Sequence, residues 1–281
     1  KTAYEIRLSL VGSEMCIRDR DWRAVDFSGL TADVFCGWHS SGLCHELNHG
    51  FLGVQSALPP ESSRRSQATA LMVALDLRAV CLLEQIHSNQ VLIASGDLTG
   101  VNELGVGDAM IADSRTQTRV GLVIYTADCV PILFRCGPLF GAIHAGWRGL
   151  ANGIIGSVIA RLTELDAEDS QLEVVIGPCA GAQVYQVGSE VVEAIGESCV
   201  YTEDLKQKRL LLDLRGTAEA QVRLAVARQR ISLGKVAVSS QCTITGSYHS
   251  YRRDSGSIGR NLSFVTAKSD DYSGLQKSRA I

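Results

Sequence analysis

The stretch VGLVIYTADCVPILFRCGPLFGAIHAGWRGL, residues 120–150, decides the fold class of this chain. Three short apolar runs stand in it, at residues 120–125, 132–134 and 140–143, with Gly, Pro or Asp near their ends. Runs of this kind are typical of strands buried inside a sheet. Directly after them, residues 149–165 place apolar side chains on one face of a 3.6-residue period, which predicts an amphipathic helix.

The same two patterns recur outside this stretch. Strands interspersed with helices predict a domain of the α/β or α+β class. A segment rich in Ser, Pro and Arg, residues 56–66, is too short for an interdomain linker and is expected to be a surface loop. The further predicted strands are residues 80–83, 91–94, 172–176 and 235–239, and the further predicted helices are residues 67–77, 188–195 and 217–230.

Composition argues against several classes of protein. The chain has 281 residues, enough for one large domain, and its formal net charge of −3 lacks the basic excess that nucleic-acid binders carry. No apolar run of about 18 residues is present, so no membrane span is expected. The nine cysteines are scattered, odd in number and without a C-x-x-C pair. They indicate free thiols in a reducing compartment, and we therefore expect a cytoplasmic protein.

The two ends of the chain are expected to lie outside the folded domain. Residues 1–20 lack clear periodicity and resemble a non-native or disordered leader, although the alternation at residues 4–11 also allows a first strand. We expect a single domain over residues 21–265 and a polar tail over residues 266–281, with fraying from Asn261 onward.

Three residues with metal-binding side chains stand at the carboxyl ends of predicted strands. His87, Cys129 and His144 each follow an apolar run, and ligand clefts of α/β sheets form at that edge. Two imidazoles and one thiolate suit Zn²⁺, with one position left open for water or substrate. Their separations of 42 and 15 residues form no short motif. Three unrelated strand-end residues that bond locally are therefore the alternative.

Charged residues near these strand ends are candidates for substrate contacts and proton transfer. Arg148 lies in the turn HAGWRG, directly before a predicted helix. Its guanidinium and the free N–H groups at the start of that helix suit phosphate or a carboxylate. A surface ion pair is the alternative for Arg148. Arg253 stands in YRRDSGSIGR, which is either an anion pocket or a solvated loop. Asp128 and Asp108 are candidate general acid/base or supporting carboxylates. For Asp128 a turn cap is the alternative.

Six blocks stand in order between residues 83 and 260, and the likeness they carry extends back to about residue 35: LEQIHSNQV, GDAMI, TADCVPILF, GAIHAGWRGL, IGPCAGAQVYQVG and YHSYRRDSGSIGR. Together they resemble the YfiH/laccase-domain family of zinc-dependent purine nucleoside phosphorylases, which is also described as multicopper polyphenol oxidoreductase. The resemblance implies a single α/β domain with layered mixed β-sheets flanked by helices, and a mononuclear Zn²⁺ in a cleft. It further implies phosphorolysis of adenosine, inosine and S-methyl-5′-thioadenosine, with adenosine deaminase as a second activity.

The metal ligands of that family fall on His87, Cys129 and His144 when they are carried over residue by residue. All three are intact, so the residues and the resemblance point to the same trio. Zn²⁺ is the expected ion, and Cu²⁺ accepts the same donors. The expected partners are purine nucleosides and phosphate, without nucleic acid or membrane, and the chain is expected to act as a monomer.

The amino-terminal block departs from the family pattern. Residues 35–48 lack the usual Arg and its paired glycines, while Leu47 and Asn48 survive. If that Arg holds substrate or phosphate in the family, its loss would alter substrate binding in this chain and leave metal binding unchanged. We expect Asn48 and Gln85 to contribute to the substrate or phosphate site.

Three other functions compete with this one. Cys129 and His144 also suit a metal-independent hydrolase or amidase, with the thiol as nucleophile and the imidazole as base. A multicopper oxidase needs several ligand clusters rich in His-x-His pairs, and the six histidines of the chain form no such pair. A purine-binding module without catalysis is the third alternative.

Overall fold

The computed structural model describes residues 33–38, 47–55, 60–205, 207–255 and 259–267. The expected leader at residues 1–20, its alternative strand at residues 4–11, and residues 268–281 of the expected tail lie outside the described residues.

The first sheet is mixed. Its first three strand pairs are antiparallel and its last two are parallel. In spatial order it consists of β1 (Asp33–Trp38), β2 (Leu47–Gln55), β15 (Arg260–Ala267), β7 (Val120–Thr126), β3 (Ala79–Glu84) and β5 (Gly100–Val106).

The second sheet is also mixed, with parallel pairs at its two edges and antiparallel pairs between them. A small third sheet contains β11 (Gln186–Val187), β13 (Arg209–Leu212) and β12 (Tyr201–Asp204). In spatial order the second sheet consists of β14 (Ser232–Val238), β10 (Gln171–Ile176), β8 (Val130–Cys136), β9 (Leu139–Ala145), β6 (Ala109–Asp113) and β4 (Val91–Ala94).

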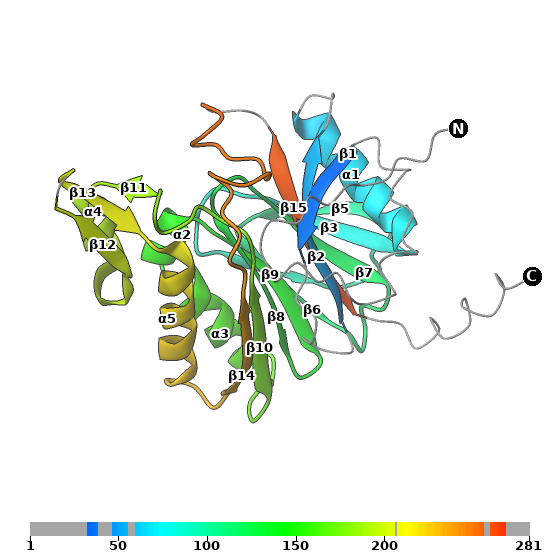
Figure 1. Cartoon of the computed structure of the whole chain (residues 1–281). Coiled ribbons are helices and arrows are strands. Elements are labelled where there is room, and N and C mark those ends of the chain that lie inside the picture. The colour runs from blue at the N-terminus through cyan, green and yellow to red at the C-terminus, as the bar shows by residue number, and fades with distance from the viewer. Residues whose placement is uncertain (1–32, 39–46, 56–59, 206, 256–258, 268–281) are drawn as a thin grey trace, which may run out of the picture.

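Helices cover the outer faces of the two stacked sheets, as Figure 1 shows. Leu71 of α1 packs in one cluster with Phe264 of the first sheet, whereas Val158 and Val222, from α3 and α5, pack on the second sheet. The expected layered α/β architecture is therefore confirmed. The helices are α1 (Pro60–Ala74), α2 (Trp147–Ala151), α3 (Ile154–Glu164), α4 (Ser189–Ile195) and α5 (Leu214–Val226), with a short 3₁₀ turn at Gly196–Ser198.

The position of β7 explains why its sequence is apolar throughout. The strand is buried along its whole length. Val123 and Tyr125 belong to the cluster beneath α1, whereas Leu122 and Ile124 belong to the cluster between the two sheets. A strand covered on both faces gains from apolar side chains at every position, so its pattern does not alternate.

The seven predicted strands all coincide with or overlap strands of the structure. The predicted loop at residues 56–66 is wrong from Pro60 onward, because α1 begins there. Pro is well suited to the first position of a helix, where its missing N–H has no partner to lose. The predicted helix at residues 149–165 is divided into α2 and α3 by Gly153, whose φ of 77° only a glycine adopts easily.

The predicted fraying from Asn261 onward is also wrong within the described residues. Residues 260–267 form β15, which lies between β2 and β7, and the strand continues two residues beyond the expected domain end at residue 265. Its polar residues Asn261, Ser263 and Thr266 are buried. The backbone of β15 is paired on both sides, so it is a central strand although its polar side chains are typical of a surface segment.

None of the helices in the described part of the chain is long and apolar enough to cross a membrane. The six cysteines whose side chains are described carry free thiols.

Phe140 tests the packing of the two sheets against each other. Its side chain is fully buried in the cluster between the sheets. Phe140→Ala should lower the free energy of unfolding by about 3–5 kcal/mol, because it removes a large buried ring and leaves a cavity. Denaturant unfolding measures this, and Val73→Ala, at a position 74% exposed on α1, is the control with little effect. An equal, small loss in both variants would contradict this packing.

Candidate metal centre

The candidate site lies where the chain passes three times from the first sheet to the second. These connections join β3 to β4, β5 to β6, and β7 to β8. Because β3, β5 and β7 run parallel, their carboxyl ends meet at one edge of the first sheet. Main-chain bonds hold the connections together: Gly107 donates to the Glu84 carbonyl, and Asp108 donates to the Gln90 carbonyl.

Three potential ligands converge at this edge. His87 stands on the first connection, Cys129 on the third, and His144 at the end of β9. The Cys129 Sγ lies 3.7 Å from the His87 Nε2, and the two imidazole centroids are 4.8 Å apart. The three ligand atoms all lie within 4.8 Å of one another. The fold thus brings together residues that the sequence separates by 42 and 15 positions.

The donor set fits a metal ion. With Zn–N and Zn–S bonds of about 2.0 and 2.3 Å, a tetrahedral site places a nitrogen and a sulfur ligand about 3.5 Å apart. The 3.7 Å between Cys129 and His87 is close to that value. In the part of the chain that the structure describes, this is the one group of three or more His, Cys, Asp or Glu side chains that can hold a metal ion.

A buried carboxylate positions both histidines: it orients the imidazole of His144 and fixes the backbone of His87. Asp108 is fully buried, and His144 donates its Nδ1 proton to it at 2.7 Å, which directs the Nε2 of His144 toward the other ligands. The backbone N–H groups of Ile86, His87 and Ser88 also donate to this carboxylate, as does the Ser88 hydroxyl. These bonds hold His87 at its positive φ of 62°. Carboxylates that fix histidine ligands in this way are typical of metal sites.

The charged groups of the cluster shift one another's pKa. Burial alone would raise the pKa of Asp108, but the hydrogen bonds from His144 and Ser88 outweigh it and lower the pKa to about 2. Burial also acts to raise the pKa of the Cys129 thiol, yet the neighbouring His144 and His87 lower it below its ordinary value. Burial acts to lower the pKa of His144, but Cys129 and Asp108 raise it. The thiol is thus readily converted to the thiolate, the form in which cysteine binds metals.

Gly146 leaves room for the cluster. A Cβ atom at this position would lie 2.8 Å from the Cys129 Sγ and 2.9 Å from the His87 Cδ2. Any side chain there would push two of the three potential ligands apart. The glycine of the HAGWRG turn is therefore a requirement of the cluster itself.

Asp128 stabilises the surroundings of Cys129. This residue has a φ of 82°, and its carboxylate accepts hydrogen bonds from the Thr243 hydroxyl at 2.6 Å and from the Arg252 backbone N–H at 2.7 Å. Both carboxylate oxygens are thus engaged with distant segments of the chain. Sequence reasoning missed Thr243 and Ser88, because nothing local marks a hydroxyl whose partner lies 115 positions away, as for Thr243, or 20 positions away, as for Ser88.

The predicted substrate residues lie in different surroundings. Arg148 is exposed, with its guanidinium 4.3 Å from the Trp147 ring centroid. Gln85 bonds the backbone N–H and carbonyl of Tyr125 with its amide group. Arg253 donates to the Asp254 carboxylate and to main-chain carbonyls of its own loop. Asn48 lies in β2, paired with Thr266. Direct substrate contact by these four residues stays a prediction, as do proton-transfer roles for Asp108 and Asp128.

Comparisons with known proteins agree with this architecture. A family model described as multi-copper polyphenol oxidoreductase laccase matches residues 37–268. A purine nucleoside phosphorylase of Corynebacterium glutamicum is 31% identical over 199 residues, which cover 69% of this chain and 76% of the relative. The purine nucleoside phosphorylase YlmD of Geobacillus stearothermophilus is 30% identical over 260 residues, or 86% and 92% of the two chains.

Solved structures share the fold. The crystal structure of YlmD from Geobacillus stearothermophilus superposes with a TM-score of 0.67 at 23% identity, covering 80% of this chain and 93% of that one. A Bacillus licheniformis protein named YfiH gives the same TM-score and identity over 79% and 93%.

Asp108→Asn tests the orientation of the imidazoles. The amide NH₂ of the new side chain would face the N–H donors that now bond the carboxylate, so some of these hydrogen bonds would be lost. We therefore expect metal affinity to fall about 10- to 100-fold. Competition with a chromogenic chelator measures the affinity. Asp113→Asn, at the other end of β6, is the control, since Asp113 pairs with Arg115 away from the cluster. Equal affinity in the two variants would contradict the role given to Asp108.

Gly146→Ala tests the space around the ligands. The added methyl should weaken metal binding at least about tenfold by displacing Cys129 and His87. Gly149→Ala, on the next turn, is the matched control, because a Cβ there has no neighbour nearer than 3.5 Å. Metal content after dialysis, with circular dichroism to verify folding, distinguishes the two. Unchanged metal content in Gly146→Ala would show that the cluster is not confined as described.

Proposed function

Because the chain belongs to the multi-copper polyphenol oxidoreductase laccase family, and because relatives about 30% identical are named purine nucleoside phosphorylases, we propose that it is a metal-dependent purine nucleoside phosphorylase. The observation that carries the proposal is the His87–Cys129–His144 cluster. One buried carboxylate holds both histidines, His144 through its imidazole and His87 through its backbone N–H. One copy of the chain supplies all three ligands, so the proposal needs no second subunit.

The proposed ion is Zn²⁺, and Cu²⁺ is the other candidate, because both accept imidazole and thiolate donors. His87, Cys129 and His144 would hold it. The ion would act as a Lewis acid toward a substrate atom or a bound water. The family description mentions several coppers, whereas the described residues offer one three-residue cluster. A single-metal centre therefore agrees better with these residues than a multicopper oxidase does.

In phosphorolysis, phosphate attacks the anomeric carbon of the ribose and the purine base leaves with the bonding electrons. The chain must therefore attract an anion and fix the nucleoside beside the metal ligands. Arg148 is our candidate for phosphate because its guanidinium is exposed on the turn that carries His144. Asp108 keeps the proton on the Nδ1 of His144, and its lowered pKa makes it an acceptor at neutral pH. We therefore propose Asp108 as a positioning residue.

The finer substrate assignments are part of the same proposal. Adenosine, inosine and S-methyl-5′-thioadenosine share the purine, the ribose ring and the glycosidic bond that phosphate would cleave. Adenosine deamination at the same centre is a second proposed activity, since the metal sites of zinc deaminases also activate water with His and Cys ligands.

Cys129→Ser and His87→Ala test the metal and the reaction together. Both variants should lose bound zinc and lose inosine phosphorolysis to below about 1% of wild type, because two ligands do not retain a catalytic ion. Elemental analysis gives the metal content, and release of hypoxanthine with formation of ribose 1-phosphate gives the activity. Cys199→Ser, at a half-buried thiol outside the cluster, is the control that should retain both.

The competing hydrolase hypothesis predicts a different result. The lowered pKa of Cys129 also suits a nucleophile with His144 as its partner. Wild-type protein stripped of metal would then remain active, and His87→Ala would lose zinc without losing turnover. Full nucleoside cleavage by either preparation would remove the metal from the mechanism.

A further inference from the structure

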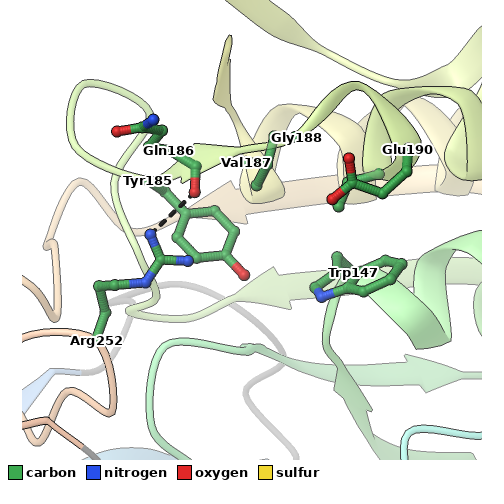
Figure 2. Close-up of a pocket in the computed structure, with 8 residues that line it drawn as sticks. Trp147, Tyr185, Gln186, Val187, Gly188, Glu190 and Arg252 are labelled. Atoms are coloured by element: carbon green, nitrogen blue, oxygen red, sulfur yellow. Dashed lines mark hydrogen bonds between the residues drawn. The ribbon is translucent and has the colours of Figure 1, made fainter. Parts of the chain in front are cut away.

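A cavity of about 440 Å³ opens on the side of the second sheet where α2 and α4 begin. Its volume is within the range of small-molecule pockets. Figure 2 shows its wall, which brings together Trp147 from α2, Tyr185 and the following strand β11, Glu190 from α4, and Arg252 from a distant loop. None of these four residues belongs to the His87–Cys129–His144 cluster.

The cavity is tied to the metal cluster at two points. Trp147 follows His144 by three residues on the same turn. The Arg252 backbone N–H donates to the carboxylate of Asp128, the residue before Cys129. Two walls of the cavity therefore belong to segments that carry or support potential ligands.

Aromatic and basic groups form one part of the wall. Tyr185 is largely buried, and the Arg252 guanidinium lies 5.0 Å from its ring centroid while donating to the Gln186 carbonyl at 2.9 Å. Trp147 is half-buried and carries Arg148 over its ring, and Arg148 does not line the cavity. Two aromatic rings held in this way offer flat surfaces to a planar base.

Glu190 is the acidic group of the wall. In Figure 2 its carboxylate lies above Trp147 on the side away from Arg252. The carboxylate folds back so closely over Gly188 that a Cβ atom at position 188 would collide with both of its oxygens. The lack of a side chain at Gly188 thus leaves the space that the carboxylate occupies. An ionised carboxylate only accepts hydrogen bonds, so it selects a ligand with donor groups at that point.

We propose that this cavity binds the nucleoside, with the base against Trp147 and Tyr185 and the ribose hydroxyls donating to Glu190. The inference rests on the proposed function and extends it to a specificity-determining residue. A carboxylate suits the neutral, donor-bearing ribose and repels phosphate, while Arg252 and Arg148 attract the anion from other sides. Glu190 would therefore favour the ribose over the phosphate at its end of the cavity.

The test uses the zinc-loaded full chain and compares Glu190→Gln with wild type on inosine, 2′-deoxyinosine and 3′-deoxyinosine. With inosine, kcat/KM should fall about tenfold, mainly through KM, because a charge-assisted hydrogen bond is lost. With at least one deoxynucleoside, which lacks a hydroxyl that Glu190 would bind, the fall should be less than about twofold. Glu193→Gln, at an exposed acid of the same helix that does not line the cavity, should match wild type on all three substrates.

Two results would overturn the inference. An equal effect of Glu190→Gln on inosine and on both deoxynucleosides, or no effect at all, would show that Glu190 does not contact the ribose. Adenosine is assayed beside them, and a loss with adenosine but not with inosine would show that the carboxylate binds the exocyclic amine instead.

Calorimetry separates this inference from the proposed function. Inosine is titrated without phosphate into the wild type and the two variants, so no turnover is needed. If the wild type shows no phosphorolysis yet binds inosine, and Glu190→Gln weakens that binding while Glu193→Gln does not, the proposed function fails and the cavity assignment stands. Binding of equal strength in all three proteins would overturn the assignment even if the enzyme is active.

Discussion

The hydrogen bonds to the Asp108 carboxylate are the interaction on which the site depends. Taking a carboxylate out of water costs several kcal/mol unless donors replace the lost hydration. Five donors do so here: three consecutive N–H groups at residues 86–88, the Ser88 hydroxyl and the His144 imidazole. Because these donors come from the turn after β3 and from β9, one charge joins the first sheet to the second. The same bonds set the direction of the His144 imidazole and fix the backbone of His87.

This arrangement explains how the protein's own contacts bring the potential ligands together. His87 and Asp128 both adopt positive φ values, a conformation that costs energy for residues with a side chain. Each is held by contacts from other segments of the chain: His87 by the Asp108 carboxylate, and Asp128 by Thr243 and the Arg252 backbone. The strain therefore sits at the two connections that carry His87 and Cys129, and hydrogen bonds from distant segments stabilise it. An ion would find ligands that are already close together.

The sequence predicted those parts of the fold whose burial is uniform. Runs such as residues 120–125 are apolar because both faces of β7 are covered, and they are visible without any alignment. It failed for β15, whose buried Ser263 and Thr266 give a central strand the composition of a surface segment. In the site, strand ends and a family resemblance identified the three potential ligands. The bonds of Asp128 to Thr243 could not be predicted, because they depend on the relative placement of segments 115 residues apart.

The HAGWRG turn links the metal cluster to the cavity by geometry alone. Within five residues it supplies a potential ligand in His144, the space for the other two at Gly146, an aromatic wall in Trp147 and an exposed cation in Arg148. His144 is paired within β9 and Trp147 begins α2, so little conformational freedom remains between them. A molecule that packs against Trp147 is therefore held at a fixed position relative to the cluster. Positioning of this kind lowers the entropic cost of bringing a substrate to a reactive centre.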